Sequence, residues 1–166
     1  MEKFPKKFLQ AEDIEMEKGK EPWKDPVEGI ITSSCGVRKN PILDRWEFHN
    51  GIDIAVAENT KAIAARGGKV IEVRYSKTLG NVLKFETEDG FIIMYAHLNK
   101  VMVKEGKQIR QGDVVAKTGN TGLSTGPHLH YSVWKGDTLM NPMQFVDLKY
   151  TDEVRAEFAA RGVADR

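Results

Sequence analysis

The pattern of hydrophobic and polar positions along this chain changes near residue 30. Before that point the sequence is polar and charged, with scattered apolar residues. After it, short apolar runs alternate with turn residues, as in "FHNGIDIAV", "GKVIEVRYS", "GNVLKFETEDGFIIMYAHL" and "HLHYSVW". Runs of this length, bounded by Gly, Asn and Asp, are typical of β-strands joined by tight turns. The pattern therefore predicts an all-β fold of mainly antiparallel sheets, with the character of a β-sandwich or barrel.

Local patterns refine this prediction at three places. Residues 70–75 alternate between two sides with a period of two, which predicts a strand. The pair Asp89-Gly90 between two apolar runs predicts the turn of a β-hairpin. Near the C-terminus, Val154 and Phe158 lie four residues apart, which favours a short packing helix. We therefore expect strands through most of the chain and short helices only at its ends.

The length of 166 residues fits one domain with short extensions. We predict a polar lead-in or short helix at residues 1–26, one β domain at 27–147, and a C-terminal extension at 148–166 in which a helix can form. No internal repeat or low-complexity segment divides the chain.

Composition narrows the range of partners. Lys and Arg number 25 against 24 Asp and Glu, so the net charge is +1 and no global field favours nucleic acid or an anionic membrane. The one cysteine, Cys35, excludes an internal disulfide. No apolar run approaches the roughly 18 residues of a membrane span, and the first residues do not form a signal peptide. From these residues alone, either the protein is cytoplasmic or an export segment or membrane anchor lies outside this sequence.

The four histidines carry the candidate chemistry. His128 and His130 are two residues apart on a predicted strand, so their side chains share one face. His49 and Asp53 are four apart and share a face on either a strand or a helix. Two histidines and a carboxylate are a ligand set that suits a catalytic zinc site with one open position. Each pattern is also common where no metal binds, but their joint occurrence favours metal chemistry, with the remaining histidines, His97 among them, free to move protons.

At this point the sequence resembles a known family. The segments "HNGIDIAV", "MYAHLNK" and "TGNTGLSTGPHLHYSVW", in this order, are similar to those of the lysostaphin-like, LytM-type zinc metalloendopeptidases, which hydrolyse bacterial peptidoglycan. The resemblance runs from about Val27 to about Val146, and makes the predicted domain at 27–147 a metallopeptidase domain. It implies a β-sheet core with a substrate groove.

The resemblance also implies roles for individual residues. His49, Asp53 and His130 match the family's three zinc ligands, and His97 and His128 match its two catalytic histidines beside the metal. In such a site Zn²⁺ activates water and polarises the scissile carbonyl. Two substrate contacts are suggested more weakly, at Trp46 and Asn81.

The implied substrate is a cross-link or stem peptide of peptidoglycan, which places the expected activity in the cell envelope or outside the cell. One alternative is a non-catalytic or dual-role scaffold of the same fold in an envelope, division or sporulation complex. Another is a biotinyl- or lipoyl-type carrier, whose Gly-spaced hairpins resemble "VKEGKQIRQGDVVAKTGNTG" but which leaves the histidines unexplained. A phosphohistidine carrier would leave Asp53 unexplained. Metal content separates both carriers from the peptidase.

Overall fold

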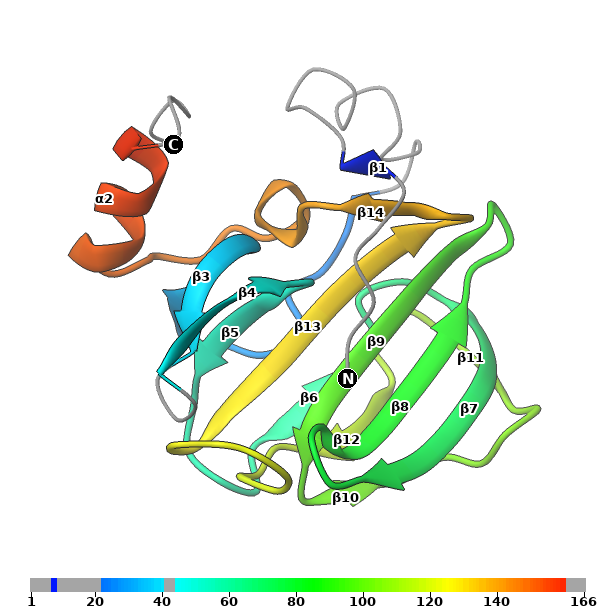
Figure 1. Cartoon of the computed structure of the whole chain (residues 1–166). Helices are drawn as coiled ribbons and strands as arrows, with labels where there is room; N and C mark the ends of the chain where they lie inside the picture. Colours follow the sequence, from blue (N-terminus) through cyan, green and yellow to red (C-terminus); the bar gives the residue numbers. More distant parts are fainter. Residues whose placement is uncertain (1–6, 9–21, 41–43, 161–166) are drawn as a thin grey trace.

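The computed structural model describes residues 7–8, 22–40 and 44–160. Within these ranges the chain forms three β-sheets and very little helix (Figure 1). The expected all-β fold is therefore confirmed.

The largest sheet contains nine of the described strands. Its main path runs in the order β1-β14-β13-β9-β8-β7-β11, and β5 joins β13 and β2 at one side. The bounds are β1 (Lys7–Phe8), β2 (Ile30–Ser33), β5 (Ile52–Ala55), β7 (Gly68–Ser76), β8 (Gly80–Glu86), β9 (Phe91–Leu98), β11 (Gln108–Ile109), β13 (His128–Lys135) and β14 (Thr138–Met140). Apart from β1 against β14, every strand pair in the described part of this sheet is antiparallel.

Two smaller sheets complete the fold. One has the order β10-β12-β6, and the other is the hairpin β3-β4. Their strands are β3 (Gly36–Asn40), β4 (Arg45–His49), β6 (Lys61–Ile63), β10 (Lys100–Val101) and β12 (Val114–Lys117). A 3-10 turn, η1 (Pro142–Phe145), and the helix α2 (Asp152–Ala160) follow the last strand. No helix in the described part of the chain is long and apolar enough to cross a membrane.

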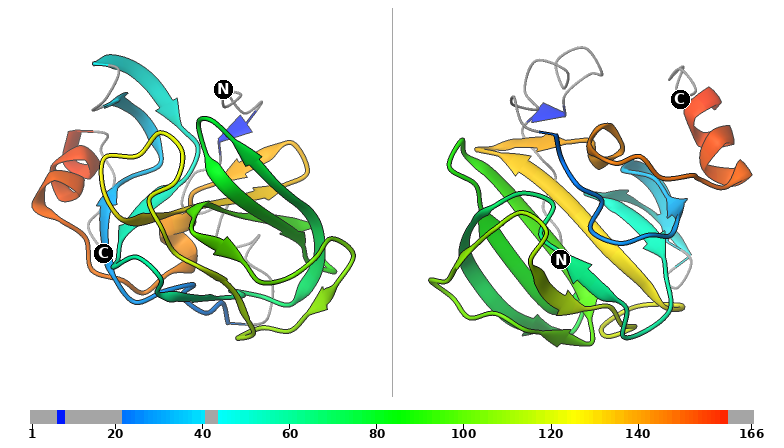
Figure 2. Two further views of the ribbon diagram at one scale, coloured as in Figure 1. Left: turned by 90° about the horizontal axis from the view of Figure 1, so that it is seen from below. Right: turned by 180° about the vertical axis from the view of Figure 1, so that it is seen from behind.

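The core lies between the large sheet and the three-stranded sheet, which covers part of its rear face (Figure 2). Small residues of the three-stranded sheet, such as Ala62 and Ala116, are fully buried with large side chains of the main sheet, such as Phe85 and Tyr95. The Tyr95 hydroxyl, which would be costly to bury alone, donates to the Ile63 carbonyl at 2.7 Å. This bond joins the two sheets.

Strand β13 is the central strand of the site region. It pairs with β9 along one edge, and with β5 and then β14 along the other. In this register His130 lies opposite Asp53 on β5 and opposite Ala96 on β9. A strand held on both edges is a rigid platform for the side chains that it presents.

The structure agrees with two of the three local predictions, the hairpin turn and the C-terminal helix, and modifies the third, the alternation in residues 70–75. Residues 70–75 lie in β7, but a bulge at Ile71 breaks the simple alternation and leaves that side chain exposed. Because the bulge adds a residue, Val70 and Val73, three apart, can both contact the core. The Asp89-Gly90 pair forms the turn between β8 and β9, with Gly90 at φ 90°. Helix α2 forms where expected.

Candidate metal centre and active site

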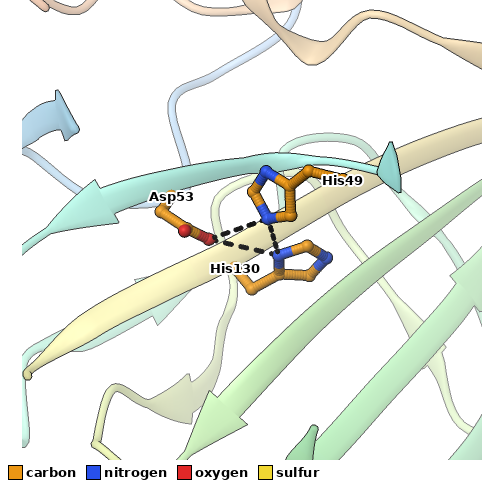
Figure 3. Close-up of side chains that lie close together, drawn as sticks. All are labelled: His49, Asp53 and His130. Atoms are coloured by element: carbon orange, nitrogen blue, oxygen red, sulfur yellow. Dashed lines mark hydrogen bonds and ion pairs between the residues drawn. The ribbon is translucent and has the colours of Figure 1, made fainter. Parts of the chain in front are cut away.

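Two side chains four residues apart and a third that is distant in sequence converge on one point in the fold (Figure 3). Nε2 of His49 lies 3.3 Å from Oδ1 of Asp53 and 3.1 Å from Nδ1 of His130. Nδ1 of His130 lies 3.2 Å from the same Asp53 oxygen. The three atoms therefore form a nearly equilateral triangle.

A break between two strands makes this convergence possible. His49 ends β4 and Asp53 lies in β5, so the two residues belong to different sheets rather than to one continuous strand or helix. Gly51 stands at the break, packed against β13: a Cβ there would lie 2.4 Å from the Tyr131 carbonyl oxygen and 3.0 Å from the His130 ring. Only glycine allows this close approach.

Hydrogen bonds on the far side of the His49 and His130 rings determine which nitrogen of each ring is protonated. Nδ1 of His49 lies 3.0 Å from the Ser34 carbonyl oxygen, which only accepts, so this nitrogen carries the proton and donates. Nε2 of His130 lies 3.2 Å from Oδ1 of Asn50 and 3.2 Å from the Ser132 hydroxyl, and donates to the Asn50 oxygen. In the neutral rings the lone pairs on His49 Nε2 and His130 Nδ1 therefore face each other and the Asp53 carboxylate.

This donor set fits a zinc ion. Three lone-pair atoms facing one another repel unless a cation lies between them. Ligands about 2.0–2.1 Å from zinc at the corners of a tetrahedron are roughly 3.3–3.4 Å apart, close to the three separations observed. Burial would raise the pKa of Asp53, but His49 and His130 outweigh it and hold the pKa well below its usual value, so the carboxylate is ionised as a ligand must be. The residues present can hold Zn²⁺.

The other two histidines lie beside the triangle and depend on one loop. Nδ1 of His97 donates to the Thr121 carbonyl oxygen at 2.6 Å, and Nδ1 of His128 donates to the Gly126 carbonyl oxygen at 2.8 Å. Their ring centroids are 4.7 Å apart. Nε2 of His128 lies 3.6 Å from Oδ1 of Asp53. In both neutral rings Nε2 carries a lone pair that can accept a proton.

His97 has an unusual backbone. It sits at φ 57°, in the left-handed region that residues other than glycine rarely adopt. Across this stretch β9 has one residue more than β8, because Leu83 pairs with Tyr95 but Asn81 pairs with Leu98. Such a bulge changes the direction of a side chain, and strained residues of this kind cluster at functional sites. Burial lowers the pKa of His97 to about 4, so its ring is neutral near pH 7.

The two suggested substrate contacts stay predictions. Asn81 is half-buried, and its Nδ2 donates to the Leu98 carbonyl oxygen at 3.0 Å, which fixes the end of β9 next to His97. Trp46 lies on β4, but its side chain is outside the described residues.

Sequence reasoning missed the outer partners of the histidines. Asn50 follows His49 directly, and Ser132 shares a strand face with His130, so their positions alone could have suggested them. The carbonyl groups of Ser34, Thr121 and Gly126 have no sequence signal, because every residue carries one.

The residues of the site lie within a segment that matches a known protein family. The sequence profile described as peptidase family M23 matches residues 47–142, which is more than half of the chain and includes all four histidines and Asp53. The chain belongs to peptidase family M23. Members of this family are zinc metallopeptidases, which agrees with the donor set. The resemblance to lysostaphin-like enzymes is therefore confirmed.

Individual M23 relatives support the same assignment. The chain is 40% identical over 96 residues to the peptidoglycan DD-endopeptidase ShyB of Vibrio cholerae, covering 58% of this chain and 22% of that protein. A zinc-containing peptidase from Vibrio cholerae has a TM-score of 0.66 and 33% identity, covering 77% of this chain and 41% of its own. The lysostaphin catalytic domain of Staphylococcus simulans has a TM-score of 0.64 and 29% identity, covering 70% and 91%. The chain spans less than a third of the length of its first curated relatives.

Proposed function

We propose that this chain is a zinc-dependent endopeptidase that cleaves peptide bonds of bacterial peptidoglycan. The observation that carries the proposal is the triangle of His49 Nε2, Asp53 Oδ1 and His130 Nδ1, with both rings oriented from outside so that their lone pairs face inward. The names of the M23 relatives support the substrate class, since several are peptidoglycan DD-endopeptidases.

In this proposal His49, Asp53 and His130 are the zinc ligands. A bound zinc ion supplies Lewis-acid polarisation of the scissile carbonyl and lowers the pKa of water. The chain contributes a ligand set of one negative charge and two neutral rings. The outer partners Asn50 and the Ser34 carbonyl keep each ring in the tautomer that binds metal.

His97 and His128 are the proposed catalytic histidines. Their Nδ1 atoms donate to loop carbonyls, so each ring offers Nε2 toward the reacting groups. His97 is neutral near pH 7 and can accept a proton from the attacking water. In this proposal the protonated His97 ring returns the proton to the leaving amine. His128 takes part in the same transfer, which its ring centroid distance of 4.7 Å from His97 supports.

The substrate and its location follow from the same proposal. Cross-links or stem peptides of peptidoglycan lie outside the cytoplasmic membrane, so we place the activity in the cell envelope or outside the cell. Residues 27–147 form the proposed metallopeptidase domain, and Trp46 and Asn81 are proposed substrate contacts.

The decisive experiment measures zinc and hydrolysis together. The wild type should bind about one zinc per chain and release peptide fragments from purified peptidoglycan, which mass spectrometry detects. Chelation should abolish release, and added Zn²⁺ should restore it. His49→Ala should lose both zinc and activity. No zinc in the wild type after reconstitution would reject the proposal.

A second variant separates metal binding from catalysis. His97→Ala removes a ring that is outside the triangle, so it should keep zinc while hydrolysis falls by about 10²–10⁴-fold. A wild type that binds zinc but releases no fragments would instead favour the scaffold alternative.

A further inference from the structure

The C-terminal segment is joined to β2 through its backbone. The Ile31 amide donates to the Lys149 carbonyl oxygen at 2.9 Å, and the Thr151 amide donates to the Ile31 carbonyl oxygen at 3.1 Å. Tyr150 thereby forms a parallel bridge with Ile31. Residues 149–151 thus extend the sheet next to the strand that leads to the site.

Helix α2 then lies against the same strand. Thr151 caps its N-terminus, because its hydroxyl accepts the Val154 amide at 3.3 Å. Val154 is completely buried in the core and anchors the helix. Glu157, three residues later, lies on the same face of α2 and therefore also points toward the domain.

Glu157 reaches a residue that contacts the metal triangle. Ser34 is buried, with 1% of its surface exposed. Its hydroxyl donates to a carboxylate oxygen of Glu157. The carbonyl of the same Ser34 accepts the Nδ1 proton of His49 at 3.0 Å. A hydrogen bond from a buried hydroxyl to a carboxylate is charge-assisted and stronger than a neutral one. The carboxylate on α2 therefore fixes the residue that orients His49.

The residue before Ser34 pairs along the strand with another member of the triangle, Asp53. Ser33 is the β2 partner of Asp53, and it follows a bulge that begins after Ile31. The short stretch from Ile31 to Ser34 is thus held by the C-terminal segment at both ends and contacts both Asp53 and His49. Ser34 and Glu157 both lie outside the residues 47–142 that match the M23 profile.

We propose that Glu157 is a positioning residue for the metal centre, acting through Ser34 to hold His49 in the tautomer and orientation that bind zinc. This inference rests on the proposed zinc-peptidase function and adds the C-terminal helix to the working site. Without Glu157 the Ser34 hydroxyl loses its partner and turns toward another acceptor. The Ser34 carbonyl then shifts, and the His49 ring loses the bond that fixes Nε2 inward.

The test compares Glu157→Ala with Glu157→Gln and with Glu153→Ala. Glu157→Gln keeps an acceptor oxygen, and Glu153 is an exposed acid on the same helix. Zinc affinity, from competition with a chelator, should fall about tenfold in Glu157→Ala, the lower end for an outer partner of a ligand. Zinc affinity should change less than about twofold in Glu157→Gln and in Glu153→Ala. Ser34→Ala and Glu157→Ala break the same hydrogen bond. The double variant should therefore lose no more zinc affinity than either single variant.

A second readout needs no metal. In metal-free protein at mildly alkaline pH, imidazole ¹H–¹⁵N spectra report the tautomer of each of the four histidines, and His49→Ala assigns the signal. The wild type should show His49 protonated at Nδ1, whereas Glu157→Ala should show a mixture of tautomers. A wild type that binds no zinc would reject the proposed function, and this spectrum would still test Glu157.

Val154→Ala controls for simple loss of stability. It loosens the packing of α2 but leaves the Ser34–Glu157 bond intact, so it should lower the unfolding midpoint more than the zinc affinity. Zinc affinity could instead fall in proportion to the unfolding midpoint in both Val154→Ala and Glu157→Ala. In that case Glu157 would only stabilise the fold and the inference would be wrong. The inference would also be wrong if Glu157→Ala and Glu153→Ala had the same zinc affinity and the same His49 spectrum.

Discussion

The two sides of the site are held in different ways. The triangle of His49, Asp53 and His130 stands on strands, and its rings bind partners from β13 and from the segments around β2 and β5. The rings of the proposed catalytic pair, His97 and His128, instead donate to two carbonyls of one loop between β12 and β13. All five residues therefore stand on strands, but partners from several segments orient the rings of the triangle, whereas a single loop orients the other two rings.

This difference separates two kinds of failure. A change in the triangle or in its outer partners should weaken or remove zinc binding and with it activity. A change in the loop should leave the metal in place and impair only proton transfer. Four predictions test this difference, beginning with the largest expected effect.

The largest effect is expected from Asp53→Asn. This change keeps the shape of the side chain but removes the only negative charge of the triangle, so stoichiometric zinc should be lost and hydrolysis should fall to background. Metal analysis and fragment release measure the two effects. Asp89→Asn is the matched control, since Asp89 is a carboxylate with a lowered pKa in the β8–β9 turn. Zinc retained in Asp53→Asn would contradict the ligand assignment.

Gly122→Ala should disable the loop without touching the metal. Gly122 has φ 77°, and a Cβ would lie 2.3 Å from the Gly80 amide nitrogen, so the loop must move and carry the Thr121 carbonyl away from His97. We expect kcat to fall on the order of 10²-fold while zinc affinity stays within about twofold. At Gly126, a Cβ would meet nothing within 4 Å, so Gly126→Ala should remain active. Equal losses in both variants would refute this account of the loop.

Asn50→Ala tests an outer partner of the triangle and should have a smaller effect. It removes the amide oxygen that accepts from Nε2 of His130 and leaves only the Ser132 hydroxyl, which can also donate, so that the ring can change tautomer. Zinc affinity should fall about 10–100-fold, with hydrolysis restored at high zinc concentration. Asn120→Ala, an exposed asparagine of the loop, should have no effect on affinity. An Asn50 variant with unchanged affinity would show that Ser132 alone suffices.

The smallest effect concerns stability at His97. At φ 57° an alanine is strained and a glycine is not, so metal-free His97→Gly should exceed His97→Ala in free energy of unfolding by about 1 kcal/mol. At His128, on an ordinary strand, the order should reverse, with glycine about 0.5–1 kcal/mol below alanine. Urea denaturation measures both pairs. The same order at both positions would remove the argument for strain.

The sequence alone predicts much of this molecule. Period-two runs and Gly-rich turns are local, so they indicate the strands and the hairpin at Asp89-Gly90. The histidine patterns and their family resemblance single out all five residues that now lie together. Local periodicity fails at Ile71, where a bulge decides which side chains face the core.

Tertiary structure decides how these residues become a site. The approach of β4 and β5 to β13, which Gly51 permits, sets the separations within the triangle, and no local pattern encodes strand register between distant segments. The carbonyls of Ser34, Thr121 and Gly126 orient three of the rings, yet backbone groups are the same in every residue and leave no trace in the sequence. The contact of Glu157 with Ser34 spans 123 residues. Local sequence determines which side chains are available, whereas long-range packing determines which backbone groups meet them.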